Sequence, residues 1–94
     1  MRHHLAIAWF RSDQWDRLRA LATDSHVLEN TFEEWRAYAE SQYADMKRKG
    51  LDVRKIDVDL DELVAWCNHK KIPLDANARS EFAAHKLQLE SNRN

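Results

Sequence analysis

Apolar residues follow two different periods along the chain, and each period predicts a different kind of element. The segment 5–10 is short and apolar on both alternating faces, which predicts a buried strand. Polar and apolar residues alternate over 53–59, which predicts a second strand. Ile56 and Val58 lie on one side of it and Asp57 on the other, so we expect this strand to be buried mainly on one face.

Helical spacing, with apolar residues every three to four positions, marks much of the remaining chain. It occurs in four segments, 13–22, 32–49, 60–71 and 76–89. The second segment follows a capping box, in which the Thr31 hydroxyl and the Glu34 carboxylate can each accept a bond from the other residue's backbone amide. Gly50 then supplies the left-handed residue that commonly ends a helix, and Pro73 separates the last two segments.

These elements predict a mainly helical α+β fold in the order β-α-α-β-α-α, with a small two-stranded sheet covered by helices. We expect one compact domain over residues 1–94, with frayed ends at 1–4 and 91–94. An isolated pair of strands is marginally stable in water. Either the helices cover the sheet closely, or one of its edges pairs with that of a second copy. We therefore predict a homodimer or another protein partner.

The composition supports a folded and well-solvated protein. Apolar residues make up 44% and charged residues 33% of the 94 positions, which disfavours both disorder and insertion into a membrane. Lys and Arg number 15 against 16 Asp and Glu, so the overall charge does not attract nucleic acid or anionic lipid. The single cysteine, Cys67, has no disulfide partner and lies in an apolar stripe. We expect a buried thiol in a cytoplasmic protein.

The densest polar feature is the acidic segment 57–62. Its carboxylates Asp57, Asp59 and Asp61 could hold Mg²⁺ or Ca²⁺ through oxygen ligands, as in a metal-dependent enzyme. The simpler interpretation is that the first two lie on the solvent face of a strand, while Asp61 and Glu62 start a helix whose dipole favours negative charge. We favour this interpretation, and we expect no cofactor, metal site or catalytic residue.

The last two predicted helices, 60–71 and 76–89, are joined by a loop of the length found in a helix-turn-helix. The second helix would then enter the major groove of DNA, carrying Arg79 and Lys86 with it. Glu81 lies between them, and the basic residues are too few to neutralise many phosphates. Nucleic-acid binding is therefore an alternative that we rank below a protein partner.

His85 differs from the other histidines because it falls beside Phe82 and Leu89 on the apolar stripe of the last helix. This position predicts a hydrogen-bonded core or boundary histidine. A pH-sensitive contact or a site residue is the alternative, because histidine titrates near neutrality. No second catalytic group can be placed beside it from the sequence.

The function that remains is that of a small, non-catalytic cytoplasmic protein that binds or regulates other proteins. Tryptophan is enriched at binding hot spots, and basic residues gather around the turn at Gly50. We therefore expect the contact surface among eight residues: Lys47, Arg48, Lys49, Arg54, Lys55, Trp9, Trp66 and His85.

Overall fold

The computed structural model describes residues 4–91, which form a small parallel sheet and four α-helices. The elements are β1 (His4–Trp9), α1 (Trp15–Leu21), α2 (Phe32–Arg48), β2 (Asp52–Asp57), α3 (Leu60–Lys70) and α4 (Ala76–Ser91). Helices make up 64% of the structure, so the predicted mainly helical α+β fold and its element order are confirmed. No helix within residues 4–91 is long and apolar enough to cross a membrane.

The predicted boundaries differ from the structure mainly at the ends of the elements. The residues 1–3 and 92–94, which we expected to be frayed, lie outside the described part of the chain. His4 lies in β1 and Ser91 in α4, although fraying was expected there too. The helix expected from residue 13 starts as a 3₁₀ turn and becomes α-helical at Trp15.

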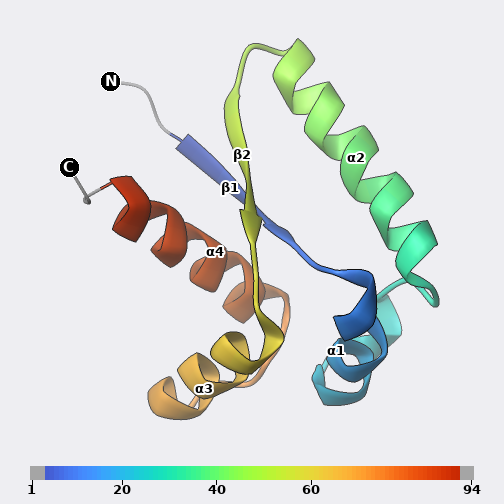
Figure 1. Cartoon of the computed structure of the whole chain (residues 1–94), viewed down its shortest axis with the longest axis vertical. Coiled ribbons are helices and arrows are strands. Elements are labelled where there is room, and N and C mark those ends of the chain that lie inside the picture. Colours follow the sequence, from blue (N-terminus) through green and yellow to red (C-terminus); the bar gives the residue numbers. More distant parts are fainter. Residues whose placement is uncertain (1–3, 92–94) are drawn as a thin grey trace.

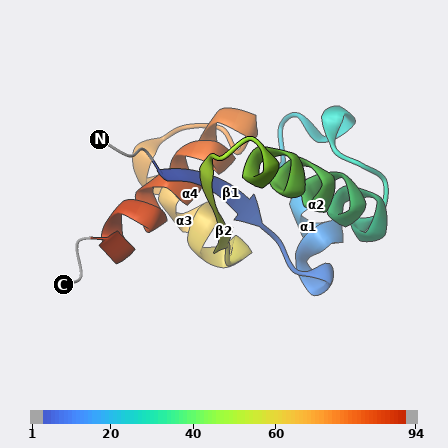
Figure 2. The same cartoon turned by 90° about the horizontal axis from the view of Figure 1, so that it is seen from above.

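The two strands run parallel, a direction that the sequence left open. Their register pairs His4 with Asp52 at one end and Trp9 with Asp57 at the other. Parallel neighbours need a crossover connection, and here α1 and α2 supply it. Figures 1 and 2 show the sheet between α2 on one side and α4 on the other, so that helices cover both of its faces.

Burial along β2 follows from this three-layer arrangement. Ile56 is 3% exposed and packs with Ala83 and Leu87 of α4. Val53 is 1% exposed and lies on the opposite face, where α2 contacts β2. Ile56 and Val58 are buried whereas Lys55 and Asp57 are exposed, as predicted for a strand buried mainly on one face. Val53 is the exception, because α2 covers the other face there.

An aromatic cluster fills the space between the sheet, α1 and α2. The rings of Trp15 and Trp35 stack with their centroids 5.4 Å apart, and Trp9 and Phe10 pack edge-on against Trp35 at 5.3 and 5.6 Å. Trp15 and Trp35 are buried, and the Trp15 indole N–H donates to the Glu29 carbonyl at 3.2 Å. Rings of this size let a small domain bury much apolar area, so these tryptophans serve the core.

The helix ends are set by local side-chain bonds, as the sequence predicts. The Thr31 hydroxyl accepts from the backbone N–H of Glu34 at 3.1 Å and so caps α2, which confirms this half of the expected capping box. The Glu34 carboxylate accepts from the Thr31 hydroxyl at 3.1 Å, where the sequence predicted a bond from the Thr31 backbone amide. The Asp59 carboxylate caps α3 in the same way. Two left-handed residues, Gly50 (φ 83°) after α2 and Lys71 (φ 58°) after α3, end these helices.

A buried ion pair holds the loop before α2 against the start of α4. The Arg79 guanidinium donates to both carboxylate oxygens of Asp24, at 2.9 and 3.0 Å, and the Ala76 backbone N–H donates to Asp24 at 3.0 Å. Only 10% of the Arg79 side chain and 19% of the Asp24 side chain are exposed. The hydrogen bond from Arg79 holds the pKa of Asp24 below its usual value.

Candidate functional site: the free edge of strand β1

Strand β1 has a neighbour on one side only. Within residues 4–91 it pairs with β2 and with no other strand. The Trp9 carbonyl accepts from the Val58 N–H at 3.0 Å, so the backbone groups of Trp9 point toward β2. Because these groups alternate along a strand, the amides of Ala6 and Ala8 point away from β2, to the open side. We call this row of outward backbone groups of residues 4–9 the β1 edge.

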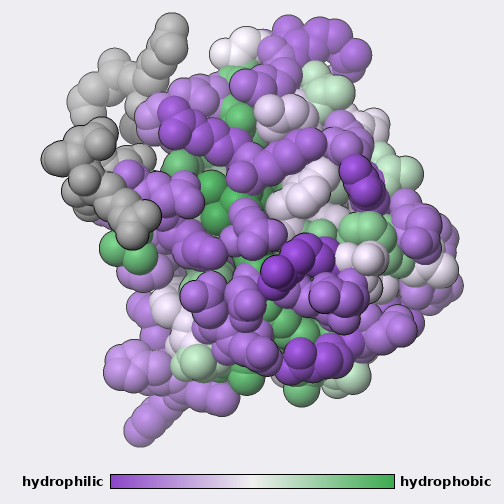
Figure 3. All heavy atoms as spheres, in the orientation of Figure 1, coloured by the Kyte–Doolittle hydropathy of each residue, from purple (hydrophilic) through white to green (hydrophobic). Residues whose placement is uncertain are grey.

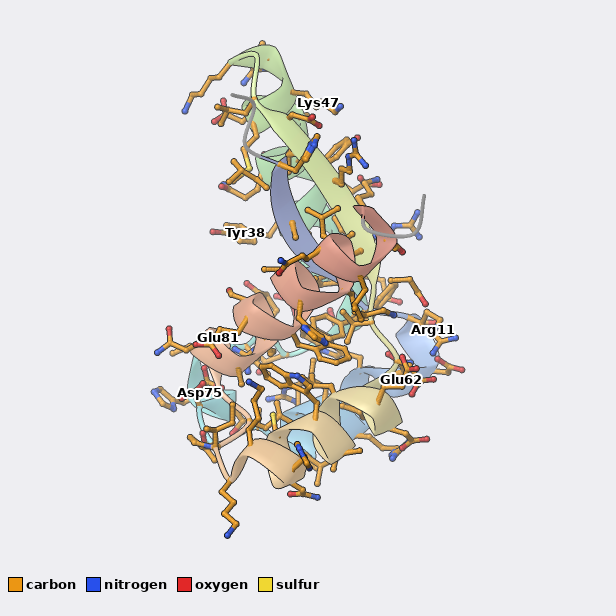
Figure 4. All side chains as sticks on the ribbon, turned by 90° about the vertical axis from the view of Figure 1, so that its left-hand side faces the viewer. Arg11, Tyr38, Lys47, Glu62, Asp75 and Glu81 are labelled. Carbon is orange, nitrogen blue, oxygen red and sulfur yellow. The ribbon has the colours of Figure 1, made fainter. Side chains whose placement is uncertain are left out.

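The β1 edge opens into a hollow at its C-terminal end. The cavity has a volume of about 460 Å³ and lies between α2 and α4. Ala8 of β1 and Phe10 just after the strand line it on one side, with Trp35 and Tyr38 of α2 and Ser80 of α4 on the others. Figure 4 shows Tyr38 projecting on the β1 side of the sheet, away from β2. A chain lying along the β1 edge would find this hollow beside it.

The side chains of β1 are uncharged apart from the titratable ring of His4. The sequence His-Leu-Ala-Ile-Ala-Trp contains no Asp, Glu, Lys, Arg or Pro. Leu5 is 41% exposed, and the residues from Ala6 to Trp9 are half-buried. Natural edge strands usually carry charges or proline that prevent pairing with another chain. The β1 edge carries neither.

The opposite edge of the sheet is protected. The Lys86 ammonium group donates to the backbone carbonyl of Asp57 at 2.8 Å and lies 3.5 Å from the Glu62 carboxylate. Charged side chains line much of β2, including Arg54 and Lys55. Figure 3 views this side of the molecule, and hydrophilic side chains cover most of it. Of the two edges, β1 is therefore the less protected against pairing with another strand.

The predicted basic surface around Gly50 forms, but acidic side chains neutralise much of it. Arg48 and Lys49 both pair with Asp45, at 2.7 and 3.0 Å. Their hydrogen bonds hold the pKa of Asp45 below its usual value, Lys49 being the larger cause. Arg54 lies 3.7 Å from Asp52. Lys47, labelled at the far end of α2 in Figure 4, has no carboxylate within 4 Å among the described residues.

Lys55 and Trp9 are the two predicted surface residues that the fold brings together most closely. The Lys55 ammonium group lies over the rings of Trp9 and Tyr43, 4.3 and 4.7 Å from their centroids, and pairs with Glu40 at 2.7 Å. These contacts hold the Glu40 pKa below its usual value through the Lys55 hydrogen bond. The cation–π pair thus covers Trp9 from the solvent side instead of leaving it as an exposed anchor.

Trp66 of α3 and His85 of α4 also meet, and Figure 1 shows α3 at the opposite end of the molecule from the turn between α2 and β2. Their ring centroids are 6.2 Å apart, and Trp66 packs edge-on against Phe82 at 5.4 Å. His85 is exposed, so the prediction of a core histidine is wrong. The buried stripe of α4 is rotated relative to the predicted one and includes Ala83 and Leu87, whereas Leu89 is 55% exposed.

The acidic segment is divided among separate partners. Asp59 caps α3 by accepting from the backbone N–H of Glu62, and its carboxylate lies 3.3 Å from the Arg11 guanidinium. The pKa of Asp59 is held below its usual value mainly by the bond from Glu62 and further by Arg11. Asp61 pairs with Arg17 at 2.7 Å. Across the described chain, no three His, Cys, Asp or Glu side chains converge as they would around a metal ion. The geometry favours helix capping and surface pairing for these carboxylates.

Helix α4 packs on the sheet along much of its length. Ala83 is fully buried against it, and Phe82 is 5% exposed. Arg79 is held by Asp24, and Lys86 by Asp57 and Glu62. The helix-turn-helix interpretation needs Arg79 and Lys86 to contact DNA phosphates, but both side chains form ion pairs or hydrogen bonds within the chain. The geometry therefore does not favour α4 as a DNA-reading helix.

Sequence reasoning did not identify the β1 edge or the contribution of Tyr38 to it. The available signal was the absence of charge in the first strand, which can be read from the sequence. Which side of that strand stays open depends on the parallel pairing, and this was not predictable locally. No protein-family model matches the chain, and no curated protein or solved structure matches it either.

Proposed function

We propose that this chain is a non-catalytic protein-interaction protein that binds an extended protein segment as a third strand at the β1 edge. The observation that carries the proposal is the contrast between the two edges of the sheet. The outward amides of Ala6 and Ala8 belong to an uncharged strand beside a cavity, whereas Lys86 and charged side chains occupy the β2 side. Strand addition draws its affinity from main-chain hydrogen bonds of this kind.

The side chains around the cavity suit an apolar segment. The buried rings of Phe10 and Trp35 form part of its wall, and Tyr38, which is 57% exposed, supplies an accessible ring and a phenol that can donate a hydrogen bond. Small apolar pockets beside a strand edge select alternate side chains of an added strand. We extend the proposal to the cytoplasm, because a single cysteine suits a reducing compartment.

A peptide copy of residues 4–10, flanked by lysines for solubility, is a suitable probe of the edge. We expect it to slow hydrogen exchange at the Ala6 and Ala8 amides while exchange at the Asp57 amide stays unchanged. Nuclear magnetic resonance of the labelled protein at low concentration would measure this. The proposed site would be refuted if the peptide did not bind, or if the peptide slowed amide exchange only around Trp66 and His85.

A matched pair of proline variants sharpens the experiment. Ala6→Pro removes an outward amide from the β1 edge, and Asp57→Pro removes one from the β2 edge. Proline is tolerated where an edge N–H faces solvent, so both variants should fold, which circular dichroism would verify. We expect only Ala6→Pro to weaken peptide binding, by about tenfold or more, because a main-chain bond is lost and the proline ring meets the added strand.

A further inference from the structure

We infer that the strand added at the β1 edge belongs to a second copy of this chain, whose own β1 pairs antiparallel with it across a two-fold axis. The inference rests on the proposed function and names the partner of that site. Its product is a four-stranded sheet in the order β2-β1-β1-β2. The grounds are symmetry, charge and the area available around the edge.

Symmetry restricts how β1 can pair with itself. A two-fold axis perpendicular to the sheet makes the two strands antiparallel and keeps each face of the sheet on its own side. Residues that face each other must then point to the same face, as Ala6 and Ala8 do. With the axis at Ile7, the outward groups of Ala6 bond to those of Ala8 in the second copy, and Ile7 faces its counterpart in a non-hydrogen-bonded pair.

This register opposes only apolar side chains in its central positions. Leu5 lies across from Trp9 of the second copy, Ala6 from Ala8, and Ile7 from Ile7. Leu5 is 41% exposed and Ile7 is half-buried, so the monomer leaves apolar surface beside the edge that a second copy would cover. Cross-strand apolar pairs are a main source of stability in sheets.

The dimer would also be closed. Pairing uses up both β1 edges and leaves the two β2 edges outermost, where Lys86 occupies the Asp57 carbonyl and charged side chains follow the strand. Edges of this kind resist further pairing, so the sheet ends at four strands and does not grow into a fibre. If the added strand came instead from a protein whose other sheet edge was uncharged and open, that edge could pair with further chains and the sheet could grow.

The molecule has enough surface on this side. Its extents are 37 × 30 × 19 Å, and Figure 1 looks down the shortest axis. Figure 4 turns the view of Figure 1 by 90°, and in it β1 (blue) lies to the left of β2 (yellow-green), on the side away from the viewer of Figure 1. The β1 edge therefore faces the broad side of about 37 by 30 Å. A standard interface buries about 800 Å² on each partner, which a face of this size can provide.

Cysteine cross-linking tests both the dimer and its register. Ile7→Cys, made together with Cys67→Ala to remove the native thiol, brings two thiols together on the axis. Facing Cα atoms in such a pair lie about 4.5 Å apart, within the range of about 4.4–6.8 Å that a disulfide spans. We expect mild oxidation to give a covalent dimer. The matched control is Lys55→Cys, because Lys55 is the β2 residue paired with Ile7 and should not cross-link.

Analytical ultracentrifugation of the unaltered protein provides a readout that does not depend on any variant. We expect a monomer–dimer equilibrium that Ala6→Pro weakens by about tenfold or more and Asp57→Pro leaves unchanged. A monomer at high concentration, a dimer that Ile7→Cys does not cross-link, or cross-linking through Lys55→Cys would overturn the inference. If the peptide still binds the β1 edge in that case, the edge accepts a different protein and the proposed function stands; if it does not, both fail.

Discussion

The ion pair between Asp24 and Arg79 supports a quantitative prediction about stability. Asp24→Ala removes the only carboxylate within 4 Å of the Arg79 guanidinium in the described chain and leaves a charge whose side chain is 10% exposed. Breaking a buried pair by removing one partner costs about 3–5 kcal/mol. Because Asp24 is itself partly exposed, we take the lower end, about 3 kcal/mol, including the lost bond to the Ala76 amide.

Thermal unfolding followed by circular dichroism measures this loss. In a domain of this size each 1 kcal/mol moves the midpoint by about 4–8 °C, so Asp24→Ala should lower it by roughly 12–24 °C. Asp45→Ala is the matched control, because its ion pairs with Arg48 and Lys49 lie on the surface and are screened by solvent. We expect that variant to unfold close to the temperature of the unaltered protein.

A double variant separates the unpaired charge from the loss of contacts. Asp24→Ala combined with Arg79→Met removes both charges and keeps an apolar chain of similar length at position 79. Replacing a buried pair with apolar residues is often close to neutral, so the double variant should recover much of the loss. A single variant that lost less than about 1 kcal/mol, or a double variant no better than the single one, would show that the buried charge does not control this region.

Three further outcomes follow from the same structure. The bond to Arg79 lowers the pKa of Asp24, so the stability that Asp24 contributes is fully present above the unfolded pKa near 3.8 and is lost as pH falls through the folded pKa. The free energies of unfolding of the unaltered protein and of Asp24→Ala, measured against pH, should therefore become equal below the folded pKa. Lys71→Gly should stabilise by up to about 1 kcal/mol and Gly50→Ala should destabilise by about as much, because both positions are left-handed, and urea unfolding would measure both. Cys67 is 3% exposed and burial raises its pKa, so a thiol reagent should react with it much more slowly in the folded protein than in the unfolded chain; equal rates would contradict its burial.

The elements that the sequence predicted well are those whose signals are local. Thr31 and Glu34 lie three residues apart, and their mutual bond forms within one helical turn, so the start of α2 could be predicted without knowing the fold. The start of α3 was predicted near its true position, but Asp59, which was expected on the solvent face of the strand, is the residue that caps the helix. The direction of β1 and β2 was not predictable, because it depends on how the intervening helices return the chain to the sheet.

The error at His85 has a physical cause in the composition of α4. The helix contacts the sheet through Ala83 and Leu87, and Arg79 is buried only because Asp24 neutralises it. An alanine and a charged residue contribute little to an apolar pattern, so the stripe appeared to pass through His85 and Leu89. Long-range pairing made Arg79 a core residue, and no local pattern contains that information.

The interaction site combines both kinds of information. The uncharged composition of β1 was visible from the start, and it led only to the prediction of a strand. The cavity beside Ala8 needs Tyr38 and Ser80, which come from helices far apart in the chain. Of the eight residues expected at the surface, most of the five cations pair with carboxylates, Trp9 lies under Lys55, and Trp66 and His85 form a separate pair of rings.

The parallel pairing of β1 with β2 has a consequence for the order in which the chain folds. Every pair in the register, from His4 with Asp52 to Trp9 with Asp57, joins residues separated by the same long stretch of chain. Bringing the two ends of this long loop together costs conformational entropy before the strand pair contributes any stability. The contacts within α2, α3 and α4 are local and form quickly. The sheet should therefore consolidate late, and the first strand should be the last element to find its place.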